Sequence, residues 1–220
     1  REIARRGHEV ASHGMDHRML GELTPHTFRA DARESRALLE DLAQAPVLGY
    51  RAPSYSVRAE TLWAIDVLAE TGYAYDSSVY PIRRRRYGYP EGPVAPARIA
   101  GPAGATLAEF PLPTLSLGVA RLPVLAGAYL RLLPAWISRL ALDRHVSHGA
   151  PFILNVHPWE IDPDQPTVGP SRRATWTHYA GLRRTAPLLV ALLGRTPFRS
   201  AASRLRELGL LPGGEAREAS

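Results

Sequence analysis

Short apolar segments of strand length alternate with longer amphipathic segments of helical period over the first third of the chain. Segments 8–12, 46–53 and 73–81 are the expected strands. Segments 24–43 and 59–72 carry apolar residues at helical spacing and are the expected helices. Strands and helices that alternate at this short spacing predict an α/β fold with a largely parallel sheet or barrel.

The ends of several expected elements carry recognisable signals. Residues 1–7 look like the last turn of a helix closed by Gly7, and Thr24 is a candidate N-cap. Further along we expect, in order, a Pro- and Gly-rich stretch over 82–106, a strand over 107–112, amphipathic helices around 125–147, a strand over 151–157, helices over 177–194 and 200–208, and a disordered tail.

The composition is that of a globular chain with one ordinary core, since 45% of its 220 residues are hydrophobic and 22% are charged. There is no cysteine, which excludes disulfides and thiolate metal sites. The first residues are charged and do not resemble a signal peptide. The most apolar region, 122–142, is interrupted by Arg131, Pro134 and Arg139, so we expect no membrane-spanning helix.

The formal net charge of +6 comes entirely from arginine, because the chain has no lysine. This usage is typical of a GC-rich bacterial genome. A basic balance can indicate nucleic acid or an anionic membrane as a partner. The arginines are scattered apart from Arg83–Arg86, and no aromatic–basic interleaving accompanies that run. We therefore expect a solvated loop there and no nucleic-acid partner.

Polar clusters follow the expected strands at their C-terminal ends, where α/β folds build their sites. The first cluster holds His13 and His17 in the spacing H-x-x-x-H. Two imidazoles could supply two of the three protein ligands of a catalytic zinc or cobalt ion. The alternative is a pair of loop histidines that cap local backbone. Asp16, between them, is interpreted as a surface residue because its side chain would have to fold back onto its own turn.

Three further residues at expected strand ends could carry chemistry. His157 could act as a general acid, or it could be a structural histidine bonded to a neighbouring loop. Arg51 could orient a carboxylate with its planar guanidinium, or form an ordinary salt bridge. Asp76 could hold His157 in one tautomer, or cap the next segment.

Four motifs stand in order along the chain: ASHGMDH (11–17), GYRAPSYS (49–56), YDSSVYP (75–81) and LNVHPWEIDPDQP (154–166). Together they resemble the polysaccharide deacetylase family, the NodB-homology members of carbohydrate esterase family four. HYAGLRRT (178–185) is similar to the C-terminal extension of the subgroup associated with exosortase-linked exopolysaccharide gene clusters.

The resemblance implies a distorted (β/α)₇ barrel and the metal-assisted hydrolysis of N-acetyl groups on a polysaccharide, with zinc as the expected ion and cobalt as a second choice. A partial deacetylase domain is expected over 1–165, an extension over 166–210 and a disordered tail over 211–220. The compartment, cytoplasmic or periplasmic, the glycan and the oligomeric state stay open.

The resemblance also assigns roles to individual residues. His13 and His17 match the metal-binding histidines, and Arg51 matches the arginine that steadies the catalytic base. Asp76 matches the acid that partners the last histidine, and His157 matches the general acid. The substrate residues are Leu154, which lines the acetyl pocket, and Tyr55 and Trp159 in the groove.

The chain departs from the family pattern at its first motif, an Asp pair that supplies the general base and the third metal ligand. No aspartate precedes the histidines, and the sequence around Glu2 and Glu9 does not match this motif. We therefore expect a barrel that is incomplete at its N-terminus and a deacetylase activity that is impaired. The alternative function is a non-catalytic module that binds glycan or a partner protein.

Overall fold

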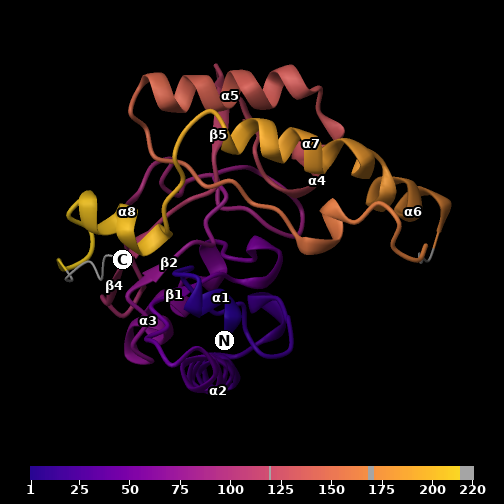
Figure 1. Ribbon diagram of the computed structural model, residues 1–220. Coiled ribbons are helices and arrows are strands. Elements are labelled where there is room, and N and C mark those ends of the chain that lie inside the picture. The colour runs from indigo at the N-terminus through magenta and orange to yellow at the C-terminus, as the bar shows by residue number, and fades with distance from the viewer. Residues whose placement is uncertain (119, 168–170, 214–220) are drawn as a thin grey trace. The chain divides into compact units, whose positions relative to one another are not determined.

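The computed structural model describes residues 1–118, 120–167 and 171–213, with the side chains of 172–174 left aside (Figure 1). The chain divides into two compact units. The first unit comprises Arg1–Leu112 and the segment that begins at Arg199, and the second comprises Pro113–Phe198. The domain boundaries expected from the motifs, at 165/166 and 210/211, stay predictions.

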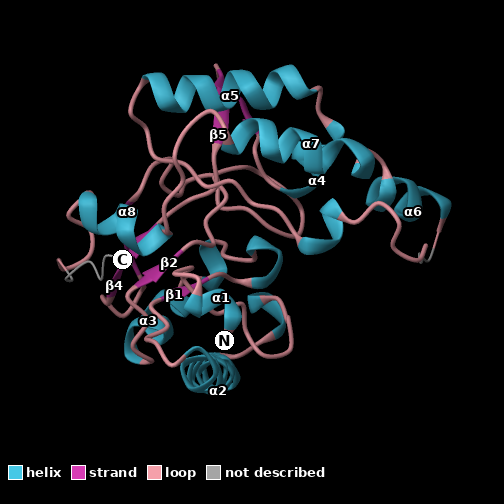
Figure 2. Cartoon of the chain, viewed as in Figure 1, coloured by secondary structure: helices cyan, strands magenta, loops and turns pink. Residues whose placement is uncertain are grey.

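The first unit is built around a small mixed sheet (Figure 2). Its strands are β1 (Gly49–Tyr50), β2 (Tyr75–Asp76), β3 (Ala97–Ala100) and β4 (Thr106–Glu109), in the order β1-β2-β4-β3. β2 pairs in parallel with β1 and β4, and β3 pairs antiparallel with β4. Its helices are α1 (Glu2–Arg5), α2 (Pro25–Ala43), α3 (Trp63–Glu70) and α8 (Ala201–Glu207), with 3-10 turns η1 (Leu20–Glu22), η2 (Pro53–Tyr55) and η3 (Ala59–Thr61).

The helix predicted over 24–43 is confirmed as α2, and local signals explain its bounds. The Thr24 side chain accepts a hydrogen bond from the Thr27 backbone N–H, and Pro25 occupies the first helical position. Gln44 ends the helix in the left-handed conformation, with φ 53°. The buried face of α2 includes Phe28 and Ala32, which join the core of the first unit.

That core gathers residues from α2, α3 and the sheet. Phe28 packs edge-to-face on Tyr50 and Trp63, with ring centroids 5.5 and 5.7 Å apart. Gly49 allows β1 to approach β2, because a Cβ at that position would lie 2.1 Å from the Tyr75 ring. A glycine is therefore required at this point of the GYRAP motif.

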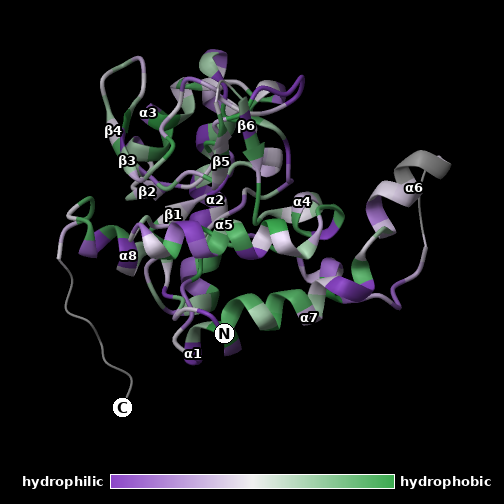
Figure 3. Cartoon of the chain, turned by 90° about the horizontal axis from the view of Figure 1, so that it is seen from above, coloured by the Kyte–Doolittle hydropathy of each residue, from purple (hydrophilic) through white to green (hydrophobic). Residues whose placement is uncertain are grey.

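The second unit is mainly helical in its described part. It contains the antiparallel pair β5 (Thr114–Leu117) and β6 (Ala120–Pro123), then α4 (Gly127–Leu132), α5 (Ala135–Ser147), the 3-10 turn η4 (Pro158–Ile161), α6 (Arg172–Tyr179) and α7 (Leu182–Leu193). Its own core includes Leu130 from α4, Leu142 from α5 and Leu192 from α7. Figure 3 shows the strongly hydrophobic composition of α7.

Several sequence-based expectations need correction. Segments 8–12 and 151–157 are not the strands that their apolar runs predict, because each makes only an isolated bridge, Ser12 to Tyr50 and Asn155 to Ala126. The helix expected over 177–194 is divided into α6 and α7 at Gly181, whose φ of 82° breaks a right-handed helix. β3 lies in the stretch expected to be irregular.

The described strands form an open four-stranded sheet and a separate two-stranded pair, and no closed barrel is found among them. The fold is thus α/β, but β1 and β2 have only two residues each and offer few ladder hydrogen bonds to a neighbour. Arg83–Arg86 lie in an exposed loop, as expected. Of the tail expected to be disordered, residues 214–220 lie outside the described part. None of the described helices is long and apolar enough to cross a membrane.

Candidate functional site

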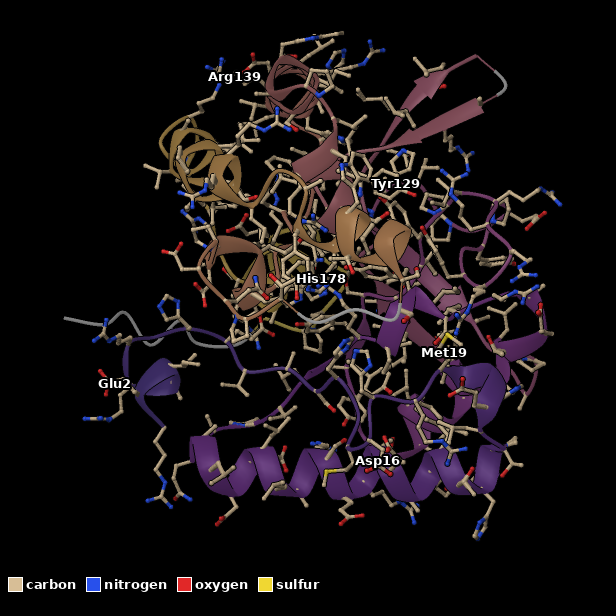
Figure 4. The ribbon with its side chains drawn as sticks, turned by 90° about the vertical axis from the view of Figure 1, so that its right-hand side faces the viewer. Glu2, Asp16, Met19, Tyr129, Arg139 and His178 are labelled. Carbon is tan, nitrogen blue, oxygen red and sulfur yellow. The ribbon has the colours of Figure 1, made fainter. Side chains whose placement is uncertain are left out.

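The loop that carries the first histidine pair is tied to the sheet and to α2. The Ser12 N–H donates to the Gly49 carbonyl, and the Ser12 carbonyl accepts from the Arg51 N–H, each at 2.9 Å. The Asp31 carboxylate of α2 accepts from the Met15 N–H at 3.2 Å. These bonds hold residues 12–17 beside the end of β1, where Figure 4 shows Asp16 near α2.

His13 and His17 lie against each other on this loop, with ring centroids 5.0 Å apart. His13 Nδ1 lies 2.7 Å from the Arg51 carbonyl oxygen, so that nitrogen donates and Nε2 would be the ligating atom. Histidines that bind metals commonly anchor their second nitrogen in this way. Both side chains are exposed, and His17 has a positive φ of 52°. The pair therefore fits the first two positions of a metal site.

In the part of the chain that the structure describes, no third ligand lies next to this pair. Among the described residues there is no group of three His, Cys, Asp or Glu side chains that could hold an ion. Asp16 is exposed, as expected, and the Asp31 carboxylate binds the Met15 N–H. Among the described residues, the site thus provides two imidazole ligands for a metal ion and no carboxylate ligand.

Arg51 links the histidine loop to the segment that follows β2. Its Nε donates to the Ser77 carbonyl at 2.9 Å and its Nη2 to the Ser77 Oγ at 2.8 Å. Its guanidinium also lies 5.8 Å from the centroid of the Tyr55 ring, within the range of a cation–π contact. Arg51 therefore contacts His13 through its backbone carbonyl, and Ser77 and Tyr55 through its side chain.

Asp76 is fully buried and faces a second buried carboxyl. It is the register partner of Glu109 across β2 and β4, and both residues have no exposed surface. The Ser78 hydroxyl donates to Asp76 Oδ1, and the Val79 N–H donates to Glu109 Oε1. Burial raises the pKa of Asp76 to about 6. Burial and the neighbouring Asp76 raise the pKa of Glu109 well above its ordinary value.

His157 lies in the second unit, directly before η4. Its Nδ1 lies 2.9 Å from Glu160 Oε2, and the same oxygen accepts from the His157 backbone N–H at 2.9 Å. Arg131 Nε donates to the other oxygen of Glu160 at 2.7 Å. Burial raises the pKa of Glu160, but the hydrogen bonds from His157 and Arg131 outweigh it and the net pKa is lowered. An ionised, buried carboxylate therefore holds the imidazole.

Aromatic rings line a pocket of about 630 Å³ beside His157. Trp159 stacks on His178, with centroids 3.9 Å apart and an interplanar angle of 13°, and more loosely on His157 at 5.7 Å. The guanidinium of Arg131 lies 4.9 Å from the Trp159 ring. Leu154 is partly buried and packs against the core of the second unit. The pocket thus places the aromatic rings of Trp159 and His178 next to the imidazole of His157.

Residues 77–206 match the family profile of a domain of unknown function (DUF3473), which is more than half of the chain. Residues 1–75 match the profile of the family described as Polysaccharide deacetylase. The chain belongs to the NodB-type polysaccharide deacetylases. The DUF3473 region is typical of the exopolysaccharide-associated subgroup of this family, which confirms the resemblance drawn from the motifs.

Two solved structures share the fold of this chain. A protein described as a polysaccharide deacetylase from Mycobacterium smegmatis is similar, with a TM-score of 0.56 and 20% identity over 100% of this chain and 70% of that one. Puue allantoinase is similar with a TM-score of 0.52 and 16% identity, over 90% of this chain and 63% of that one. At these identities the likeness concerns the fold. No curated protein sequence matches the chain.

Motif reasoning alone misses two charged residues that hold His157 in this NodB-type chain. Glu160 stands three residues after His157, which is the spacing of a capping box, and the Glu160 carboxylate indeed binds the His157 N–H. Arg131 interrupts an apolar run in the sequence, yet only 3% of its side chain is exposed. Arg139, which interrupts the same apolar run, is exposed, so the sequence did not show which of the two arginines forms a buried ion pair.

Proposed function

We propose that the chain is a metal-dependent deacetylase that removes N-acetyl groups from a sugar polymer in exopolysaccharide biosynthesis, within a NodB-type (β/α)₇ barrel. The observation that carries this proposal is the pair His13 and His17, with ring centroids 5.0 Å apart and one ring anchored through Nδ1 to the Arg51 carbonyl. The arrangement suits an ion that activates water, and the family profile of residues 1–75 supplies the reaction class.

His13 and His17 would hold the ion, for which zinc is the first choice and cobalt the second. When bound, such an ion polarises the acetyl carbonyl and lowers the pKa of a water ligand. The third ligand and the general base are the roles that the resemblance gives to an Asp pair, and no residue of this sequence matches that pair. Arg51, held by Ser77, would steady the base.

His157 would protonate the departing amine of the sugar. An imidazole held through Nδ1 by an ionised carboxylate presents Nε2 outward, and 46% of the His157 side chain is exposed, so its proton can exchange. Leu154 would line the acetyl pocket, and Tyr55 and Trp159 would contact sugar rings. The motif assigns the acid partner of His157 to Asp76, whereas in the structure His157 Nδ1 lies 2.9 Å from Glu160 Oε2.

The first prediction concerns His157. Replacement by asparagine (His157→Asn) should lower kcat for release of acetate from an N-acetylated chitooligosaccharide by about 100-fold or more, because a general acid contributes about 10²–10⁴. His148→Asn is the matched control, since His148 is an exposed histidine of the same unit that binds only local groups, such as the Arg144 carbonyl. Acetate release is measured with added zinc or cobalt. An equal loss of kcat in both variants would contradict the role of His157 as the general acid.

A second candidate function, a module that binds glycan without turnover, is favoured by the stacked rings of Trp159 and His178. Such a module binds the oligosaccharide, loses affinity in Trp159→Ala and releases no acetate with either metal. Acetate release above the metal-free background excludes it as the sole function.

A further inference from the structure

We propose that the segment Thr177–Arg184, which lies in the DUF3473 region, positions His157 through Arg131 and Glu160. The inference rests on the proposed role of His157 as general acid. It assigns a task to part of a region whose family profile names no function. It also gives Glu160 the positioning role that the motifs assign to Asp76.

Glu160 controls the orientation of His157 directly. One oxygen, Oε2, accepts from both the backbone N–H and Nδ1 of His157, each at 2.9 Å. Because an ionised carboxylate only accepts, the neutral imidazole carries its proton on Nδ1. Nε2 is then the nitrogen that exchanges protons with solvent or substrate. Rotation of the ring would break the Nδ1 bond and leave a buried carboxylate oxygen with one donor fewer.

Arg131 keeps Glu160 ionised and in place. Its Nε lies 2.7 Å from Glu160 Oε1, and only 3% of the arginine side chain and 1% of the glutamate side chain are exposed. A buried ion pair persists only when the remaining polar atoms are also satisfied. The planar guanidinium therefore needs further acceptors, since one nitrogen is directed at Glu160 and the others are buried with it.

The segment Thr177–Arg184 supplies those acceptors. Arg131 Nη1 donates to three of its carbonyl oxygens, those of Thr177, His178 and Ala180, at 3.2, 2.9 and 2.8 Å. They lie where α6 ends, and the carbonyl oxygens of a helix C-terminus are natural acceptors for a buried cation. The Arg131 carbonyl in turn accepts from Arg184 Nη2 at 2.9 Å. The segment thus contacts both the side chain and the backbone of Arg131.

Gly181 sets how closely the segment approaches. Its φ is +82°, and a Cβ there would lie 2.5 Å from the Arg131 carbonyl oxygen. An alanine would force this backbone away from Arg131. Gly149, in the same unit, has a φ of +61°, and a Cβ there would meet no other group within 4 Å. Gly149→Ala therefore imposes similar backbone strain without touching Arg131.

The test follows the tautomer of His157 by ¹⁵N NMR at alkaline pH, where the imidazole is neutral. We expect the Nδ1–H tautomer in the unaltered chain and in Gly149→Ala. Glu160→Gln and Gly181→Ala should give a mixture of both tautomers, with folding checked by circular dichroism. Asp76→Asn should leave the tautomer unchanged.

Kinetics supply the second readout. Glu160→Gln and Gly181→Ala should lower kcat by about tenfold or more with little change in KM, because a misoriented acid affects the chemical step more than binding. An unchanged tautomer in Glu160→Gln, or an equal response of Gly149→Ala and Gly181→Ala, would overturn the proposal. The NMR result does not depend on turnover. A chain with the expected tautomers and no acetate release would contradict the proposed function alone.

Discussion

At the scale of single residues, the first unit prepares His13 more fully than His17. Both side chains are exposed, but His13 is anchored through Nδ1 to the Arg51 carbonyl, whereas His17 is a residue with positive φ. The spacing H-x-x-x-H could be read from the sequence, but the anchor could not, because Arg51 is brought to His13 only by the bridge between Ser12 and Tyr50. A bond from Nδ1 to a backbone carbonyl is common to the metal role and to the capping role, so the metal role of the pair stays a proposal.

The residue-scale prediction is a loss of zinc affinity in His17→Ala. Removal of one of two imidazole ligands should weaken binding by about tenfold or more. His26→Ala is the control, since His26 is an exposed histidine on α2 in the same unit. Equilibrium dialysis against zinc measures both affinities. If His26→Ala loses as much affinity as His17→Ala, zinc binds elsewhere on the surface.

At the scale of elements, the start of helix α2 follows a local sequence signal, whereas the bounds of strands β1 and β2 do not. α2 begins where Thr24 caps it, a signal that can be read in the sequence, and ends at the left-handed Gln44, at a position where Gly or Asn is usual. β1 and β2 are only two residues long, although apolar runs of eight and nine residues surround them. A strand ends where its neighbour stops pairing, so periodicity alone overestimates its length.

The element-scale prediction concerns the cap of α2. Thr24→Ala should lower the free energy of unfolding by about 1 kcal/mol, because the Thr27 N–H loses its acceptor at a helix start. Thr24→Ser keeps the hydroxyl and should cost much less. Urea titrations followed by circular dichroism give both values. Equal destabilisation by serine and alanine would show that the methyl group of Thr24, rather than its hydroxyl, stabilises the helix start.

At the scale of the whole molecule, each unit has a core of its own, and the first also contains the carboxyl pair Asp76–Glu109. Both pKa values are raised in the fold, so the folded chain binds more protons than the unfolded chain above the ordinary pKa values, near 4. The stability contributed by the pair is therefore complete at low pH. It is lost as the pH rises through about 6 for Asp76, and through the raised pKa of Glu109 for the second carboxyl.

The whole-molecule prediction compares the unaltered chain with Glu109→Gln. From pH ~4 to pH ~7 the unaltered chain should lose roughly 1–3 kcal/mol more stability than the variant, because the amide removes one of the two buried charges. Urea titrations at several pH values measure the difference. If stability falls more steeply with pH in the variant than in the unaltered chain, the prediction is wrong. The two carboxyls would then repel each other less than their burial and shared register indicate.

The sequence by itself determined the α/β class, the family and the positions of the motif residues, because helical period, helix caps and short motifs are properties of neighbouring residues. Only the tertiary structure decided that Glu160 meets an arginine 29 residues earlier and that Asp76 meets Glu109 across two strands. Such pairs form only when chain closure and burial bring distant segments together, and no local pattern encodes which partners meet.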